Sequence, residues 1–375
     1  MFFKSMIRKL KDIQIDGRVR FFLPIAIVAV IKLFSFAWVQ QAMIQNPENF
    51  ADHQWWQIFG RWDAGWYNII ARNWYETTAE ASVSMLFAFP PAYPTVIRVL
   101  GIIIGNFTAS QVSISLFFGF LWIPLFQLVA EQYFSKRESF LTTVIAALFP
   151  SVFLFTSVGY SEGLFITLIL LSWLLYLKGR KGQSALAAAG ASLTRFIGII
   201  LILPMLIESF RRRDAKSAVL YTAPTLIAQI GWAFYGFLKT DSVFAFFEAH
   251  GNWINKLFLN QYVAPTLLQS EPTFPFNVPY PEAVAAFEIA FVAIFILIII
   301  KIHDIDWRLL VYSSFSFLFI VLTGNIGDYV RYLSFLFPVW FIFRSKSLRL
   351  LIPIVGLLGF CDLLYMYLFA RWVFL

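Results

Sequence analysis

Long apolar stretches run through the whole chain and constrain its fold more than any other feature. Residues 21–39, 113–130, 283–300 and 350–369 each approach the roughly 20 apolar residues that a helix needs to cross a bilayer. Only 13% of the residues are charged, against about a quarter in a soluble domain. Strand-like alternation of apolar and polar residues is missing. The sequence therefore predicts an all-α integral membrane protein.

Several kinds of site are excluded or disfavoured by the residue types present. Cys361 is the only cysteine, so an intramolecular disulfide or a CxxC metal site is impossible. The three histidines lack any HExxH-like spacing, and we expect no metal site. The basic N-terminus precedes a long apolar run without a clear cleavage site, which we interpret as a retained first helix.

The distribution of Lys and Arg predicts the orientation in the membrane and explains the net charge of +8 without a nucleic-acid partner. Most of these residues fall in short segments, which the positive-inside rule makes cytoplasmic. Two long segments, 45–85 and 239–282, carry an excess of acidic residues and should face outward. The cytoplasmic segments are 4–20, 136–137, 178–181, 211–216, 301–308 and 344–349.

This charge map implies an irregular topology within a single transmembrane domain, residues 1–375. Residues 87–130 must cross once although they hold two apolar runs, and residues 185–210 must return to their starting side. Half-length or re-entrant helices satisfy both requirements where protein shields the broken backbone. We expect about 9–11 crossings.

The first outer loop contains the most informative segment, a predicted short helix over residues 60–72. Helical spacing places Asp63 on the same face as Trp66, Tyr67 and Ile70, and places Arg61 on the opposite face with the polar residues. A carboxylate on an aromatic face needs a partner or a function. The alternative is a helix lying at the interface with Asp63 paired to Arg61, a common and weak contact.

Three further charged residues interrupt apolar surroundings. Glu162 follows Tyr160 at a predicted outer turn, on the same side as Asp63, although it could be a solvated helix end. Arg195 lies deep in an apolar stretch, where a charge is costly and usually functional. Arg331 either pairs with Asp328 on its own helix or, with Arg195, binds phosphate oxygens.

An ordered series of short motifs resembles the PIG-V family, the GPI mannosyltransferase 2 group and its prokaryotic relatives. The series covers residues 55–205 well, and the C-terminal half mainly through hydropathy. It departs from the family at Phe89-Pro90-Pro91, where relatives tend to have two phenylalanines before one proline. The short chain also leaves little room for the insertions of eukaryotic members. Both points favour a prokaryotic relative, with an acceptor other than GPI. The motifs are residues 61–64, 70–71, 87–90, 93–94, 149–154, 159–162, 194–195 and 331–332.

The resemblance implies a GT-C-like helical bundle with its active site on the extracytoplasmic face. It implies transfer of mannose from a polyprenyl- or dolichyl-phosphate donor to a lipid- or glycan-linked hydroxyl, by an inverting single displacement. Asp63 matches the expected catalytic base. We expect no cofactor and no metal, and a location in the plasma membrane of a prokaryote or the endoplasmic reticulum of a eukaryote. The residues assigned to substrate binding are Arg61, Trp62, Tyr160, Glu162, Arg195 and Arg331.

Two other classes of protein remain as alternatives. A transporter or lipid-linked sugar flippase also buries charges, but such proteins usually show repeated halves and a site near the midplane. A membrane scaffold would give Asp63 and Arg195 no clear purpose. The absence of a repeat and of a glycine-rich nucleotide loop favours a glycosyltransferase with a lipid-linked donor.

Overall fold

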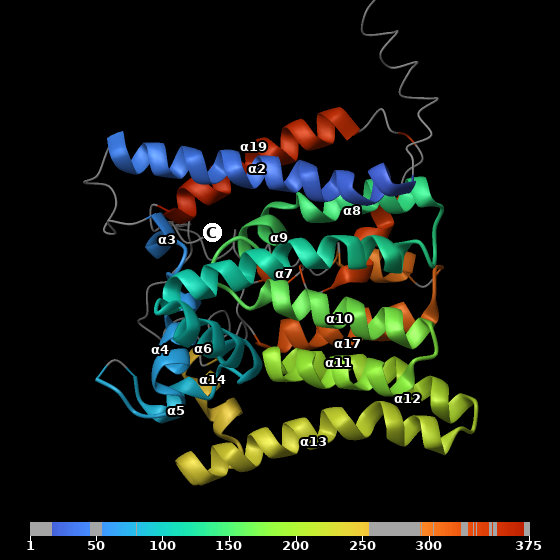
Figure 1. The fold of residues 1–375 in the computed structure, drawn as a ribbon. Helices are drawn as coiled ribbons and strands as arrows, with labels where there is room; N and C mark the ends of the chain where they lie inside the picture. The colour runs from blue at the N-terminus through green and yellow to red at the C-terminus, as the bar shows by residue number, and fades with distance from the viewer. Residues whose placement is uncertain are drawn as a thin grey trace, which may run out of the picture.

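The computed structural model describes residues 17–45, 55–79, 81–254, 293, 295–302, 304–323, 329–332, 334, 336–344, 347 and 351–370. All regular elements within these ranges are helices, as predicted (Figure 1). The first half contains α2 (Gly17–Gln45), α3 (Trp55–Ile58), α4 (Asp63–Asn73), α5 (Val83–Leu86), α6 (Ala92–Ile104), α7 (Phe107–Ala130), α8 (Lys136–Ala147), α9 (Pro150–Phe155) and α10 (Glu162–Leu177). The second half contains α11 (Lys181–Thr194), η2 (Phe196–Leu201), α12 (Ile202–Arg211), α13 (Ala215–Thr240), α14 (Ala245–Ile254), α17 (Trp307–Thr323), α18 (Tyr329–Tyr332), η5 (Phe337–Phe343) and α19 (Leu351–Ala370).

Three helices of the described ranges are long and apolar enough to cross a membrane: Val19–Gln45, Phe107–Ala130 and Leu351–Ala370. Large apolar side chains such as Leu33 and Phe34 are exposed on α2, at 68% and 67%, which suits a surface that faces lipid. Other apolar helices, α10 among them, are shorter. The chain is thus a helical membrane protein, and about 9–11 crossings stays a prediction.

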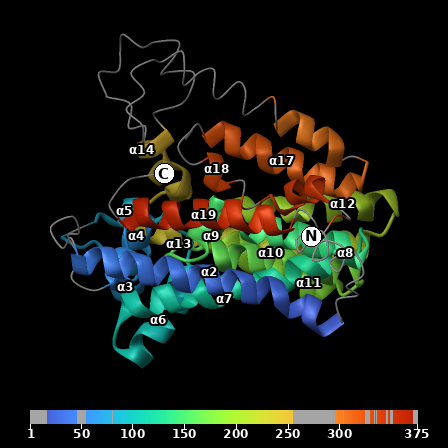
Figure 2. The same ribbon diagram turned by 90° about the horizontal axis from the view of Figure 1, so that it is seen from above.

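The long helices form a layered bundle with α10 in its interior. α10 packs between α7 and α11, and α13 covers α11 on the far side, whereas α2 and α19 lie together on the other side of α7 and α9 (Figures 1 and 2). Most side chains of α10 are buried, including Phe165, Leu170 and Trp173. Its sequence is apolar on every face, which suits a helix surrounded by others.

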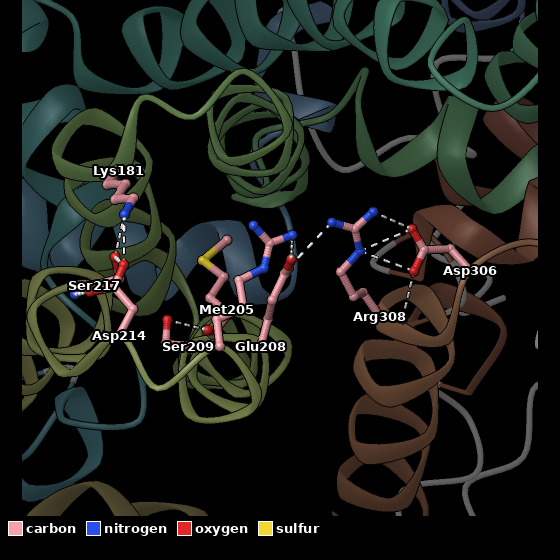
Figure 3. A network of polar contacts seen from close by, with 9 residues as sticks. Lys181, Met205, Glu208, Ser209, Asp214, Ser217, Asp306 and Arg308 are labelled. Carbon is pink, nitrogen blue, oxygen red and sulfur yellow. Dashed lines mark hydrogen bonds and ion pairs between the residues drawn. The ribbon is translucent and has the colours of Figure 1, made fainter.

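Several of the basic segments that the charge distribution predicted to lie on one side are found together at one end of the bundle. Lys181 at the start of α11 lies 3.1 Å from Asp214, next to the start of α13. Arg308 of α17 binds the carboxylate of Asp306 and also Glu208 of α12, at 3.3 Å (Figure 3). These contacts confirm that residues 185–210 leave this end and return to it.

The opposite end, called the outer-loop end below, holds α3, α4 and α5 of the predicted first outer loop. α6 and, from the predicted second outer segment, α14 gather there too, on the left of Figure 1. Glu76 forms an ion pair with Lys239 at the end of α13, so the two predicted outer segments meet. α6 has only 13 residues and ends at Gly105, which has φ 77°, before the full-length α7. The half-length helix expected within residues 87–130 is therefore present. Residues 255–282 of the second loop lie outside the described ranges.

Candidate active site

Four charged side chains from distant parts of the sequence meet at the outer-loop end of the bundle. Arg331 of α18 donates from Nη1 to Asp63 Oδ2 over 2.6 Å, and from Nε to Glu162 Oε1 over 2.5 Å. Arg195, just after α11, donates from Nη1 to the same Glu162 oxygen over 3.1 Å. Two carboxylates and two guanidinium groups thus form a continuous cluster with no net charge.

Both carboxylates occupy the first position of a helix. Asp63 begins α4 and Glu162 begins α10. The unsatisfied N–H groups and the dipole at a helix N-terminus favour negative charge. Because Glu162 is completely buried, it also needs its two arginine partners to offset the cost of desolvation. Local structure and ion pairing therefore act together to hold the two carboxylates in place.

The two carboxylates differ in accessibility. The Asp63 side chain is 35% exposed, whereas Glu162 is fully buried and Arg331 is only 4% exposed. The second oxygen of Glu162, Oε2, makes no hydrogen bond within the described part of the chain. Asp63 is therefore the carboxylate of the cluster that a bound molecule can reach, with Glu162 behind it.

Aromatic rings hold the guanidinium groups in place. The Arg331 guanidinium lies 4.7 Å from the ring centre of Tyr160 and 5.0 Å from that of Phe155. The Arg195 guanidinium lies 5.6 Å from the ring centre of Tyr332. Cation–π contacts of this kind add to the ion pairs and restrict the planes of the arginine side chains. Tyr160 itself is buried, at 1% exposure.

The turn before α10, residues 156–161, is fixed from several sides. The N–H of Gly159 donates to the carbonyl of Phe59 over 2.7 Å. The Ser115 hydroxyl donates to the carbonyl of Tyr160 over 2.7 Å, and the Tyr67 and Ser161 hydroxyls lie 2.8 Å apart. Burial raises the pKa of Tyr67 to about 12, so its phenol stays protonated at neutral pH. These contacts set the position from which Glu162 begins its helix.

Asp63 follows a strained backbone position. Trp62 has φ 58° and ψ −130°, a left-handed conformation that is rare for a bulky residue. Such strain costs about 1–3 kcal/mol and persists only where the surrounding structure imposes it. The strain also explains one error of the sequence interpretation, because the helix begins at Asp63 and leaves Arg61 and Trp62 outside it.

The environment of α4 differs from the predicted one in two further ways. Asn68, predicted on the polar face, packs against α7 and donates to Thr108 Oγ1 over 3.2 Å and to Gln111 Oε1 over 3.1 Å. The buried Arg61 donates to the carbonyl of Ala370 over 2.5 Å, at the end of α19. Asn68 and the preceding Arg61 therefore bind neighbouring helices instead of facing water.

Most of the predicted site residues come together. Arg331 contacts Asp63, Glu162 and Tyr160. Arg195 joins the cluster through Glu162, and Trp62 adjoins Asp63 in sequence. Arg61 instead contacts the end of α19. Asp328, the alternative partner considered for Arg331, lies outside the described residues.

His250 of α14 is a neighbour that the sequence did not reveal, because it lies in no recognisable motif. Its Nδ1 lies 2.9 Å from the carbonyl of Phe246, whose ring stacks on Phe196 beside Arg195. Burial lowers the pKa of His250 below its usual value; the charge of Arg195 acts in the same direction and that of Asp63 in the opposite one. A titratable imidazole therefore lies within the electrostatic field of the cluster.

The described residues include no group of three or more His, Cys, Asp or Glu side chains arranged to hold a metal ion. The positive charge at the site comes from Arg195 and Arg331. Two fixed guanidinium groups can bind an oxyanion. The half-exposed carboxylate next to them can accept a proton from a neighbouring hydroxyl.

No family model matches the chain, and no curated protein matches its sequence significantly. Among solved structures, the chain is similar to the Archaeoglobus fulgidus oligosaccharyltransferase. The apo form aligns with a TM-score of 0.46 and 13% identity, covering 93% of this chain and 56% of that one. The complex with Zn and sulfate aligns with a TM-score of 0.45 and 14% identity, covering 92% of this chain and 52% of that one. The chain thus spans about half the length of these structures.

Proposed function

We propose that the chain is a membrane glycosyltransferase that moves a sugar, most simply mannose, from a polyprenyl- or dolichyl-phosphate donor to a hydroxyl of a lipid- or glycan-linked acceptor. The observation that carries this proposal is the ion-pair cluster of Asp63, Arg331, Glu162 and Arg195. It combines a reachable carboxylate with two guanidinium groups at the end of the bundle that the charge map assigns to the outside.

Arg195 and Arg331 are proposed to bind the donor phosphate. Guanidinium groups match phosphate oxygens in geometry and stay charged at any physiological pH. Glu162 and the facing aromatic rings fix their directions before the donor arrives. Charge that develops on the departing phosphate then meets preorganised cations, which is where electrostatic stabilisation is most effective.

Asp63 is proposed as the general base. The acceptor oxygen attacks the anomeric carbon, the bond from that carbon to the phosphate oxygen breaks, and the lipid phosphate leaves with the bonding electron pair. The acceptor hydroxyl proton passes to the Asp63 carboxylate. A single displacement of this kind inverts the anomeric configuration.

The remaining assignments follow from this chemistry. Trp62 and Tyr160 contribute aromatic surface near the base, and Arg61 supports the segment that precedes it. Because the arginines supply the cations, the proposed reaction needs neither a metal nor an organic cofactor. The proposed location is the plasma membrane for a prokaryotic protein, or the endoplasmic reticulum membrane for a eukaryotic one.

The test is sugar transfer in membranes from radiolabelled polyprenyl-phosphate mannose to endogenous lipid or glycan, with wild type and Asp63→Asn compared. The variant keeps the shape of the side chain and removes the base. The proposal expects transfer by wild type and loss of transfer by the folded variant. No transfer by wild type from any prenyl-phosphate sugar would contradict the proposal and favour a transporter.

A further inference from the structure

Gln111, near the start of α7, connects the two segments that carry the carboxylates. Its side chain is fully buried. The amide nitrogen Nε2 donates to the carbonyl of Ala64 over 2.8 Å and to the carbonyl of Gly159 over 2.6 Å. The amide oxygen Oε1 accepts from Asn68 over 3.1 Å. Both ends of the amide are thus hydrogen-bonded, which fixes its orientation.

The two carbonyls belong to parts of the chain that are far apart in sequence. Ala64 directly follows Asp63 in α4, and Gly159 lies in the turn that leads into Glu162. A single side chain on a third element therefore ties the start of α4 to the start of α10. A buried amide that donates to two carbonyls cannot be replaced by an apolar group without leaving both acceptors unsatisfied.

This bracing matters because Arg331 spans both carboxylates. The contacts of 2.6 Å to Asp63 and 2.5 Å to Glu162 exist together only while the two helix starts keep their separation. A shift of about 1 Å in a reacting group costs up to about 100-fold in rate. The relative position of α4 and α10 therefore bears directly on where the candidate base sits.

We propose that Gln111 is a positioning residue that holds Asp63 in register with the Glu162–Arg331 pair. This role rests on the proposed function, because it concerns the reach of Asp63 to the acceptor hydroxyl. Gln111 does not itself touch the reacting atoms. Its loss displaces the base while both arginines keep their direct contacts with Glu162.

Two substitutions remove the brace in different ways. Gln111→Leu removes both donors. Gln111→Glu is nearly the same size, but its carboxylate faces two carbonyl oxygens that it cannot bind. Gln127→Leu is the matched control, since Gln127 is a second fully buried glutamine of α7 and its Nε2 contacts Glu131, in the next turn of the chain, at 3.3 Å. Asn68→Ala, at a half-buried position, removes the partner of the Gln111 amide oxygen, together with the contacts of Asn68 with Thr108 and Arg72, and leaves both Gln111 donor contacts in place.

The experiment measures kcat and the donor KM of each purified, full-length variant, together with its thermal unfolding. We expect both Gln111 variants to lose about 10- to 100-fold in kcat with a donor KM within about threefold of wild type. Gln127→Leu should match wild type in both parameters. Asn68→Ala should lose about threefold to tenfold in kcat, which keeps the test decisive if the Gln111 variants fail to fold.

Two results would overturn the assignment. One is a kcat for folded Gln111 variants equal to that of Gln127→Leu; the other, if they do not fold, is a wild-type kcat for Asn68→Ala. Wild-type turnover separates this inference from the proposed function. Absence of transfer by wild type contradicts the function and the role with it, whereas transfer with equal kcat in all variants contradicts only the role of Gln111.

Discussion

Arg331 and Asp63 lie 268 residues apart in sequence and form a 2.6 Å ion pair at the outer-loop end of the bundle. The same guanidinium reaches the buried Glu162 through a different nitrogen. The candidate base and the candidate phosphate ligand are therefore physically linked, and a bound phosphate must share Arg331 with two carboxylates. In the proposed mechanism, donor binding and the freedom of Asp63 to accept a proton are coupled through this one side chain.

Replacing Arg331 by lysine tests that link. A lysine ammonium keeps the charge but presents a point instead of a planar fork, so it cannot reproduce the two separate contacts. We expect Arg331→Lys to lower kcat/KM by about 100-fold, in the range seen for loss of one preorganised donor. The matched control is Arg344→Lys, at an exposed arginine that lies 5.2 Å from the ring of Phe134. Equal activity of the two variants would show that the fork geometry is unimportant.

Gly119 of α7 allows the close approach of the turn before α10. A Cβ at this position would lie 2.1 Å from the carbonyl oxygen of Thr156, which belongs to backbone and cannot move aside. We expect Gly119→Ala to destabilise the protein by about 1–3 kcal/mol and to lower activity by displacing Glu162. Gly231→Ala on α13 is the control, because nothing lies within 4 Å of its added Cβ. Thermal unfolding of both variants provides the comparison, and equal melting temperatures would refute the close approach.

His250 predicts a pH dependence of stability. Burial holds its folded pKa below the usual 6.5, so the unfolded chain binds more protons around that pH. The contribution of neutral His250 to the free energy of unfolding is complete above about pH 6.5. It is lost as the pH falls through the lowered pKa. We expect His250→Gln to lose less stability than wild type between about pH 7.5 and pH 5. If the melting temperatures of the two proteins change in parallel over this pH range, the lowered pKa of His250 is contradicted.

Chelation of metal ions should leave transfer unchanged. The proposed cations at the departing phosphate are Arg195 and Arg331, which EDTA does not affect. The measurement is the rate of sugar transfer in detergent-solubilised protein before and after EDTA, and after addition of Mg²⁺ or Mn²⁺. A rate that falls with EDTA and returns with the metal would require a metal site outside this cluster.

The sequence identified several of the charged residues of the cluster for physical reasons. A carboxylate on an aromatic face, as at Asp63, and an arginine in an apolar stretch, as at Arg195, are costly unless paired. The structure confirms that both are paired. The distribution of basic residues separately predicted half-length or re-entrant helices within residues 87–130 and 185–210, and α6 is such a half-length helix.

Other parts of the site could not be read from the sequence. Gln111 and Ser115 are ordinary polar residues near the start of an apolar helix, and only the tertiary fold brings the carbonyls of Gly159 and Tyr160 to them. The strained Trp62 and the actual start of α4 were missed for a similar reason. Helical periodicity describes a helix once it has begun but does not locate a backbone strain imposed by packing.

The most direct test of the central claim is the kcat for sugar transfer from polyprenyl-phosphate mannose by purified wild type and Asp63→Asn. Removal of a general base typically costs between about 100- and 10,000-fold. We predict a loss within this range, with thermal stability close to that of wild type because Asp63 is 35% exposed. A folded Asp63→Asn variant that transfers sugar at the wild-type rate would contradict the account and move the search for the base to Glu162.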